Sequence, residues 1–457
     1  MKQTILEPAK TIPVLAEADV VVAGGGPSGV MAAVAAARHG ARTILVERFS
    51  CLGGVATMGL PIQGYCAENG EQIVMGLPEE FRQRLTAKGG AVDHFVPCKM
   101  HNPFLVVSPE AVKNVCQEML LEAGVTVLLD TVAVDVAGTP DHLEAILVEG
   151  KSGRQAILGR FFIDATGDAD LVARAGLPYT LAAPEELQAS TLGVILSGVD
   201  KHAIQKHLLE DPAYYDLYPM LPREQIAHAD YYIMAGLSNV ARRAAQEGRF
   251  KELYGMVNFV TLPEPDMMYV NTVHVSGRSP CDTAELSALE LAARTQTETV
   301  LAFLREYVPG FRDAVVVSTG PWLGIRESRI IDGLERLTIE DIRAGHISDK
   351  AIALGGYPYD FHQQDVGDNK VQFHKVPIYG IPYGCLVPKG AGNMLVAGKT
   401  ISATREAMCS SRVMAQCMAE GQAAGTAAAM CAASGCAAPA LDVALLRQTL
   451  LRDGATL

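Results

Sequence analysis

Residues 19–47 read DVVVAGGGPSGVMAAVAAARHGARTILVE, and this stretch decides the fold. The β-branched apolar run at 19–23 predicts a short strand buried in a parallel sheet. The segment 24–29 is a glycine turn of the form G-x-G-x-x-G. The Ala-rich segment 30–39 predicts a helix that a glycine ends, and 42–46 predicts a second strand. Strand, glycine turn, helix and strand in this order indicate a dinucleotide-binding unit.

Each residue of the glycine turn has a physical role in such a site. Gly24 permits the tight turn, Gly26 lets the backbone approach a pyrophosphate, and Gly29 lets the helix pack on the strand. The helix begins at Pro27 and Ser28, where free N–H groups and the positive end of the helix dipole attract phosphate. The sequence therefore predicts that these five residues form the dinucleotide site.

An acidic residue and a second glycine pair follow the second strand. Glu47 ends that strand, where a carboxylate can accept hydrogen bonds from an adenosine ribose. Gly53 and Gly54 indicate another close approach of the backbone to the ligand. The predicted site thus extends beyond the first glycine turn.

The composition restricts the class of protein. A chain of 457 residues with 49% hydrophobic and 19% charged residues is expected to form two or three compact domains. A net charge of −13 argues against a nucleic-acid partner, because phosphate contacts need a basic surface. We expect no membrane span and no secretory signal. Ten scattered cysteines without C-x-x-C pairs predict reduced thiols, a cytoplasmic location and no metal site.

Eight segments in a fixed order resemble one family. They are GGGPSG, ERFSCLGGVAT, DATGDADL, NTVHVSG, GIRESRII, YPYDFH, IPYGCLVPKGAGNMLVAGKTIS and SSRVMAQCMAEGQAAGTAA. Together they resemble the bacterial FAD-dependent oxidoreductase family of the glutathione-reductase-like (two-dinucleotide-binding-domain) FAD superfamily. The resemblance implies an α/β fold, in which a Rossmann-like FAD-binding domain of glutathione-reductase type carries an inserted α+β substrate domain.

The resemblance also implies how the cofactor is held. FAD is expected to bind non-covalently, and Arg48, Gly53, Gly54 and Thr57 continue the site towards the pyrophosphate and flavin. The start of the last helix is expected to face the flavin, where its dipole and an arginine stabilise negative charge. Further cofactor contacts are implied for Val132, in the strand predicted at 131–136, and for Ala165, Thr166, Gly167, Gly398, Ser411, Arg412 and Val413.

Two features depart from the superfamily pattern. Gly398 and Lys399 stand where the superfamily has glycine followed by an acid that holds the ribityl chain. Arg405 stands where the family often has histidine, and Gly384 where it often has arginine. The contacts to substrate can therefore differ in this chain.

Nucleotide-binding motifs at both ends of the chain enclose a middle of different composition. We therefore expect a discontinuous FAD-binding domain, residues 1–188 and 376–457, and a substrate or cap domain at 189–375. Because ligand sites favour domain interfaces, the substrate is expected between the middle domain and the C-terminal segment.

The sequence also predicts the secondary structure of three further segments. The stretch 200–254 predicts a largely helical insertion, and 409–433 predicts one long helix. The segment 267–275 predicts a strand whose alternation places His274 and Tyr269 on opposite faces.

Two histidines are candidates for proton transfer. His362 can act as a general base oriented by Asp360, since an imidazole titrates near neutrality. His274 is a weaker candidate of the same kind. The alternative, which is the more usual one for any single histidine, is an ordinary core or surface residue.

Three arginines are candidates for substrate binding. Arg326 and Arg329, three residues apart, can share one helical face and clamp a carboxylate or phosphate. The alternative is a structural ion network that includes Glu327. Arg405 is the third candidate, so that the proposed catalytic set is His362, Arg326, Arg329 and Arg405.

The expected function is that of an FAD-dependent oxidoreductase. The absence of a second G-x-G-x-x-G excludes a dedicated NAD(P)H domain, and a single tryptophan, Trp322, excludes the W-x-W-x-I-P motif of flavin halogenases. The leading hypothesis is a dehydrogenase or oxidase that exchanges a hydride between flavin N5 and a small polar organic substrate. The alternatives are a reductase of activated double bonds fed by an external electron donor and a non-catalytic flavin-binding subunit. The sequence leaves open the substrate, the electron acceptor and whether the chain forms a homo-oligomer.

Overall fold

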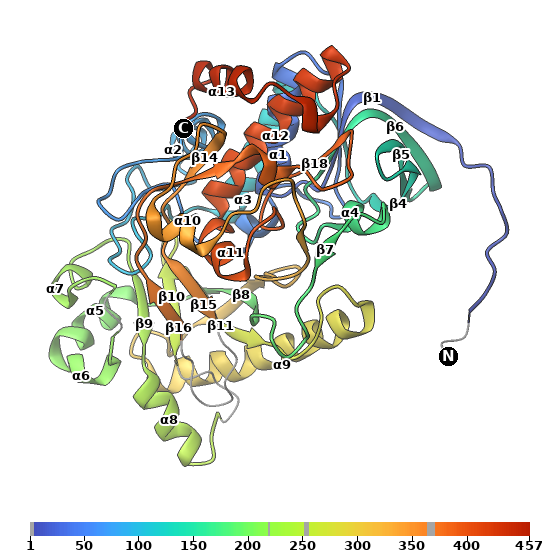
Figure 1. Ribbon diagram of the computed structural model, residues 1–457. Coiled ribbons are helices and arrows are strands. Elements are labelled where there is room, and N and C mark those ends of the chain that lie inside the picture. Colours follow the sequence, from blue (N-terminus) through green and yellow to red (C-terminus); the bar gives the residue numbers. More distant parts are fainter. Residues whose placement is uncertain (1–3, 218–219, 251–255, 363–370) are drawn as a thin grey trace.

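The computed structural model describes residues 4–217, 220–250, 256–362 and 371–457 (Figure 1). Two large β-sheets organise them. A mainly parallel sheet uses strands from both ends of the chain, and an antiparallel sheet uses strands from the middle. The fold is therefore of the α/β class, with the parallel sheet that a Rossmann-like dinucleotide-binding domain requires.

The first sheet has seven strands in the order β3-β2-β1-β6-β5-β4, with β18 beside the end of β6. Strands β1, β2, β3, β6 and β18 run parallel, whereas β5 is antiparallel to both of its neighbours. The strands predicted at 19–23 and 42–46 are confirmed. The bounds are β1 (Val14–Ala23), β2 (Thr43–Val46), β3 (Thr126–Leu128), β4 (Val132–Thr139), β5 (His142–Gly150), β6 (Gly153–Asp164) and β18 (Met394–Val396).

The register of this sheet brings three loops to one edge. Ala23, at the end of β1, pairs with Asp164, at the end of β6, and Asp164 pairs with Val396, at the end of β18. The glycine turn 24–29, the turn 165–168 and the loop after β18 therefore leave the sheet side by side. This is the edge at which parallel α/β sheets bind ligands.

Both faces of the first sheet are covered. Val20 and Val22 of β1 belong to the large core shared with α1 (Pro27–Arg38) and α12 (Met414–Ser434). Val21 and Ala23 point to the opposite face and pack in a second core with β5 and α4 (Asp170–Arg174). This alternation is the two-residue period of a strand that is buried on both sides.

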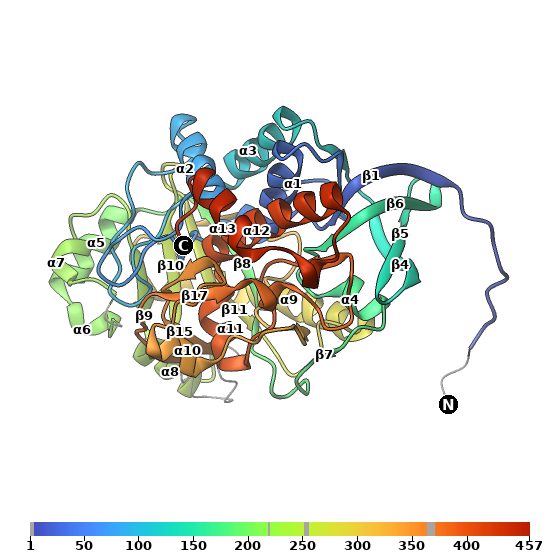
Figure 2. The ribbon, with the colours of Figure 1, turned by 45° about the horizontal axis from the view of Figure 1, so that its top comes forward.

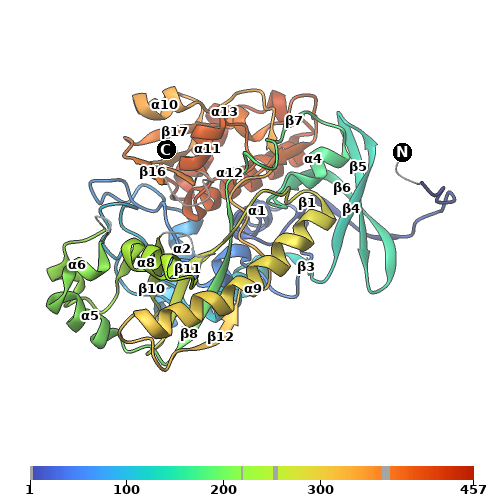
Figure 3. The same ribbon diagram turned by 90° about the horizontal axis from the view of Figure 1, so that it is seen from below.

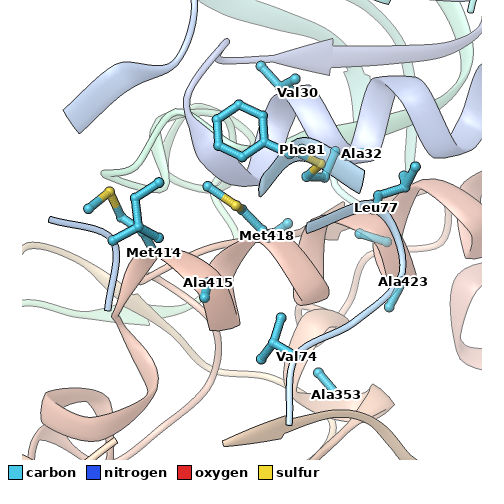
Figure 4. Packing of buried hydrophobic residues seen from close by; sticks show 14 of the residues in the cluster. Val30, Ala32, Val74, Leu77, Phe81, Ala353, Met414, Ala415, Met418 and Ala423 are labelled. Carbon is cyan, nitrogen blue, oxygen red and sulfur yellow. The ribbon is translucent and has the colours of Figure 1, made fainter. Parts of the chain in front are cut away.

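Helices α1 and α12 lie side by side although they come from opposite ends of the chain (Figure 2). Their backbones touch, because a Cβ at Gly421 would lie 2.1 Å from the carbonyl oxygen of Ser28. A Cβ at Gly425 would lie 2.0 Å from that of Ala32. Buried side chains of α2 and α12 fill the space around the crossing (Figure 4). The surrounding helices are α2 (Leu77–Ala87), α3 (Pro109–Glu122) and α13 (Val443–Arg452).

The second sheet is antiparallel and has the order β12-β8-β11-β10-β9. The long helix α9 (Thr283–Tyr307) packs against β8 and β11 (Figure 3). Shorter helices α5 (Lys201–Glu210), α6 (Pro212–Tyr215), α7 (Arg223–Ile226) and α8 (Ser238–Gln246) surround the far end of this sheet. Its strands are β8 (Ser190–Ser197), β9 (Ile233–Gly236), β10 (Val257–Thr261), β11 (Met268–Val275) and β12 (Val315–Thr319).

Three two-stranded sheets lie apart from the two large ones: β7 with β13, β14 with β17, and β15 with β16. None of the helices in the described ranges combines the length and apolarity that a bilayer crossing requires. The remaining elements are β7 (Tyr179–Thr180), β13 (Ile330–Ile331), α10 (Ile339–Ala344), β14 (Ala351–Gly355), β15 (Tyr359–His362), β16 (Val371–His374), β17 (Tyr379–Pro382), α11 (Arg405–Ser411) and the 3₁₀ turns Gly54–Met58, Tyr383–Leu386 and Ala438–Ala440.

The segment 200–254 is largely helical where it is described, as predicted, but it also supplies the edge strand β9. Residues 218–219 and 251–254 of this segment lie outside the described residues. The short apolar run of β9 is buried against β10, so tertiary packing selects a strand there.

The single helix predicted at 409–433 is wrong. The chain forms two helices, α11 and α12, which meet at Arg412 and Val413. Val413 has extended backbone angles, and the N–H of Ala415 donates to the carbonyl oxygen of Gln63 at 3.1 Å. A hydrogen bond to a distant segment thus replaces a helical one, and a new helix N-terminus begins in the interior.

The contact between α1 and α12 generates a test of the fold. Gly421→Ala places a methyl group against rigid backbone, so we expect a loss of about 1–3 kcal/mol in the free energy of unfolding. The measurement is denaturant unfolding of the FAD-free protein. Ala433→Ser, at an exposed position of the same helix, is the control and should change stability by less than about 0.5 kcal/mol. Equal stability of the two variants would contradict this packing.

Candidate active site

One cavity lies at the edge where the three loops leave the first sheet, and it extends to the second sheet. Its wall contains residues from the glycine turn, from β10 and β11, and from the break between α11 and α12. Of the predicted cofactor residues, those in the wall are Gly24, Gly26, Pro27, Ser28, Glu47, Arg48, Gly54, Ala165, Thr166, Gly167, Gly398, Arg412 and Val413.

The glycine turn has the geometry that a dinucleotide requires. Gly24 has φ of +106°, and a Cβ there would lie 2.2 Å from the carbonyl oxygen of Ala165. Gly26 differs, because a Cβ there would meet nothing within 4 Å. The open space at Gly26, directly before the N-terminus of α1, is a cradle in which a pyrophosphate can approach the backbone. The residues present therefore fit the group.

Glu47 is buried, and it organises the loops around it. Its Oε2 accepts from the N–H of Gly25 at 2.5 Å, and its Oε1 accepts from the N–H of Phe49 at 2.9 Å. Burial raises the pKa of the carboxyl group, and the two N–H donors oppose that rise. Glu47 thus fixes the glycine turn in addition to its expected contact with a ribose.

Five predicted cofactor residues lie outside the cavity wall. Gly29 packs behind the turn, where a Cβ would lie 1.8 Å from the carbonyl oxygen of Gly24. The hydroxyl of Thr57 donates to the carbonyl oxygen of Gly54 at 2.7 Å. Val132 begins β4 and is exposed. These residues support the site from behind or lie beyond it; they are Gly29, Gly53, Thr57, Val132 and Ser411.

The loop after β18 carries Lys399 directly after Gly398. Lys399 Nζ donates to Ser328 Oγ at 2.6 Å and lies 3.2 Å from Asp168 Oδ1. Burial alone would raise the pKa of Asp168, but Lys399, Ser328 and Arg48 together outweigh it and hold the pKa below the ordinary value. A lysine–carboxylate pair between two loops thus stands beside Gly398.

A β-bulge in β11 aims a histidine into the cavity. Val270 pairs with Val194, but Val273 pairs with Leu192, so β11 contains one extra residue between these pairs. The bulge reverses the alternation, and His274 therefore lines the cavity together with Tyr269. The prediction that His274 and Tyr269 lie on opposite faces is wrong for this reason.

His362 lies at the end of β15 and lines the cavity, as proposed. Its Nε2 is 3.0 Å from Asp360 Oδ1, because the two residues lie two positions apart on one face of β15. Burial lowers the pKa of His362, and Asp360 opposes this effect. The imidazole is therefore held neutral near pH 7, the state in which it can accept a proton.

A chain of polar groups continues beyond Asp360. The Tyr357 hydroxyl lies 3.4 Å from Asp360 Oδ2, and it also contacts His101 Nδ1 at 2.8 Å. Burial lowers the pKa of His101 to about 4. Sequence reasoning missed both residues. Tyr357 stands in a segment that the resemblance marks, whereas His101 lies in an irregular loop where no local pattern signals its position.

Arg326 and Arg412 are the two arginines at this end of the cavity. Arg326 Nη1 donates to the carbonyl oxygen of Ala189 at 2.6 Å and to the Thr191 hydroxyl. Arg412 Nη2 donates to the carbonyl oxygen of Asp360 at 3.2 Å and lies 3.9 Å from its carboxylate. Both arginines line the cavity, and their roles toward FAD or substrate stay predictions.

The other two catalytic candidates lie outside the cavity wall. Residues 326–329 are not helical, so Arg326 and Arg329 do not share a face. Arg329 donates to Asp170 at 2.8 Å and to the carbonyl oxygen of Asp168 at 2.7 Å. Arg405 forms an ion pair with the buried Glu327. Both arginines join segments of the fold and do not reach the cavity.

Aromatic side chains close the cavity near Glu47. The rings of Phe49 and Trp322 are stacked with centroids 3.7 Å apart, and both residues line the wall. Trp322 is the single tryptophan of the chain. Its fluorescence therefore reports on this cavity alone.

A model of the family described as FAD dependent oxidoreductase matches residues 19–450. The chain belongs to this family. FAD is accordingly its cofactor, and the protein is an FAD-dependent oxidoreductase. A comparison with curated proteins found no match.

Several solved structures are similar to this FAD-dependent oxidoreductase. A geranylgeranyl bacteriochlorophyll reductase-like protein from Thermoplasma acidophilum is 14% identical, with 96% of this chain and 84% of that chain covered and a TM-score of 0.45. The flavin-dependent brominase Bmp2 is 12% identical, with 95% and 83% covered and a TM-score of 0.49. The p-nitrophenol 4-monooxygenase PnpA from Pseudomonas putida DLL-E4 is 11% identical, with 96% and 87% covered and a TM-score of 0.43. Similarities this low add nothing to the description of the site.

Two glycines of the turn should respond to substitution in opposite ways. Gly26→Ala fills open space, so the FAD-free protein should keep its stability within about 0.5 kcal/mol. The same variant should bind FAD at least about tenfold more weakly, because the methyl group occupies the cradle. The measurements are thermal unfolding without FAD and titration of the FAD-free protein with FAD, followed by Trp322 fluorescence.

Gly24→Ala is the matched control for this test. Its Cβ meets backbone and its φ is left-handed, so the FAD-free protein itself should lose about 1–3 kcal/mol of stability. If Gly26→Ala kept wild-type affinity for FAD, the pyrophosphate would not lie at this turn.

Proposed function

We propose that this FAD-dependent oxidoreductase exchanges a hydride with a small polar organic substrate, as a dehydrogenase or oxidase. The single observation that carries the proposal is that one cavity contains both the dinucleotide turn and the pair formed by His362 and Asp360. The cofactor edge and a base are thereby available to the same small molecule.

When bound, FAD supplies a two-electron acceptor at flavin N5 for the hydride that leaves a substrate carbon. The chain supplies the proton chemistry. The contact of His362 Nε2 with Asp360 favours the tautomer with its proton on Nε2, which leaves a lone pair on Nδ1. That nitrogen is the proposed acceptor of the proton that the substrate loses from oxygen or nitrogen.

Asp360 positions the base and balances its charge. Burial opposes ionisation of Asp360, but His362 and Arg412 outweigh burial and hold its pKa below the ordinary value. The carboxylate therefore stays ionised and can stabilise His362 once it is protonated. Arg412 also holds Asp360 in place, because its Nη2 donates a hydrogen bond to the backbone carbonyl oxygen of Asp360.

The same proposal includes the division of the chain. Residues 1–188 and 376–457 would form an FAD-binding domain of glutathione-reductase type, and residues 189–375 a substrate or cap domain. The antiparallel sheet β12-β8-β11-β10-β9 supports this division, because its strands all come from the middle segment. Non-covalent FAD and a cytoplasmic location stay predictions.

Anaerobic spectroscopy of the FAD-loaded protein against a panel of alcohols, amines and acids tests the reaction class. Loss of the oxidised flavin absorbance with one of these compounds supports the proposal. Reoxidation of the chemically reduced protein by an enone or enoate would instead favour a double-bond reductase. If no compound changed either state, a non-catalytic flavin-binding subunit would be the better description.

The role of His362 generates a kinetic prediction. His362→Ala should slow flavin reduction by roughly 10²–10⁴-fold, because the substrate then loses its base. The FAD content, read from the ratio of visible to ultraviolet absorbance, should stay normal. His346→Ala, at an exposed position outside the cavity wall, is the matched control and should keep the wild-type rate. An unchanged rate in His362→Ala would refute the assignment of the base.

The pH dependence tests the pair of His362 and Asp360. The base is active while His362 is neutral, so the rate should fall only as pH drops through its lowered pKa, on the acid side of 6.5. Because Asp360 raises the pKa of His362, Asp360→Asn should move this acid limb to still lower pH. The measurement is the pH profile of anaerobic flavin reduction. A limb that stays in place or moves to higher pH would contradict the pairing.

A further inference from the structure

The polar end of the cavity has two positive charges and only one negative charge. The charged groups that line it are the guanidinium groups of Arg326 and Arg412 and the carboxylate of Asp360. His274 and His362, whose rings stack with centroids 6.2 Å apart, complete this end. Burial lowers the pKa of both histidines, so neither adds or removes charge near pH 7.

The one carboxylate lies in ion-pair distance of Arg412, and it acts on Arg326 only from further away. Asp360 lies in ion-pair distance of Arg412 and of His362. Among the residues that the structure describes, no carboxylate lies in ion-pair distance of Arg326. The nearest acid along the chain, Glu327, is paired with Arg405. Arg326 is therefore the arginine at this end of the cavity that has no carboxylate of the described residues in ion-pair distance.

The neutral partners of Arg326 occupy one part of its guanidinium group. Nη1 donates to the carbonyl oxygen of Ala189 and to the hydroxyl of Thr191. Nη2 has a long contact of 3.4 Å with His274 Nε2. Within the described part of the chain, Nε has no hydrogen-bond partner. Nε and Nη2 form one edge of the planar fork, which matches the two oxygens of a carboxylate.

A guanidinium in such a place is costly without an anion. Arg326 is half-buried, and the neutral acceptors around it replace only part of the water that the fold removes from its guanidinium group. Burial and the nearby Arg412 accordingly lower the pKa of Arg326 to about 10. Because Arg326 lines the cavity, a bound anion can supply the missing charge.

We propose that Arg326 binds the carboxylate of the substrate, so that the substrate class of this enzyme is the small carboxylic acids. The proposal rests on the function proposed above, since it places the carboxylate beside His362. Two links fix the scale: Arg326 contacts His274, and His274 stacks on His362. Arg326 and His362 therefore lie at the same end of the cavity, where one small molecule can reach both. A single surplus charge favours a monoanion over a phosphate dianion.

Ligand binding to the oxidised FAD-loaded protein tests this assignment without turnover. The probes are acetate and benzoate, with the neutral analogues acetamide and benzamide and with inorganic phosphate for comparison. The readouts are the flavin difference spectrum and Trp322 fluorescence, since Trp322 lines the same cavity. We expect saturable binding of the carboxylates, at least about tenfold tighter than that of the amides or phosphate.

Two variants locate the effect, and a third controls for charge. Arg326→Gln should weaken carboxylate binding at least about tenfold, and Arg326→Lys should weaken it less, because charge remains but the fork is lost. Arg329→Lys makes the same change three residues further on, outside the cavity wall, and should bind as wild type does. FAD content and thermal unfolding of each variant establish that it is folded, and Arg326→Lys keeps the test valid if Arg326→Gln does not fold.

The outcomes separate this inference from the proposed function. Equal binding of carboxylates and amides, tighter binding of phosphate, or unchanged carboxylate affinity in Arg326→Gln would each overturn the carboxylate site. Flavin reduction by a neutral compound, with no carboxylate bound, would also overturn it and leave the reaction class intact. Specific carboxylate binding without flavin reduction by any compound would support the site and contradict the reaction.

Discussion

Contact between backbones around the glycine turn is the constraint on which the rest of the structure depends. Side-chain atoms at Gly24 would collide with the turn after β6, and at Gly421 they would collide with α1. Segments from the start, the first third and the end of the chain therefore meet at one point. These close contacts fix the three segments relative to one another at the edge of the sheet. The open space at Gly26 lies at that edge.

The second wall depends on irregular features of otherwise regular elements. The bulge in β11 turns His274 towards the cavity, and the break between α11 and α12 places Arg412 and Val413 there. Each irregularity leaves backbone or side-chain polar groups without their usual local partners. These groups then bond to distant segments, and the polar end of the cavity is assembled in this way.

Local patterns were sufficient to predict the strands at 19–23 and 42–46, the glycine turn and the proximity of His362 to Asp360. In each case the period of a strand or the steric demand of a glycine decides the geometry within a few residues. The face of His274 was mispredicted because one extra residue in a strand reverses its alternation. The roles of Arg329 and Arg405 depend on Asp170 and Glu327, which only the fold brings near them. The contact of Tyr357 with His101 has the same origin.

The central claim is that the FAD site and the base share one cavity, and a crystal structure of the FAD-loaded protein tests it most directly. The account predicts the pyrophosphate at the 24–29 turn and the flavin ring facing β15. The His362 side chain should then lie within about 10 Å of that ring, which allows direct contact with a small substrate or one bridging water. A flavin ring that turns away from β15, with His362 beyond that distance, would contradict the account.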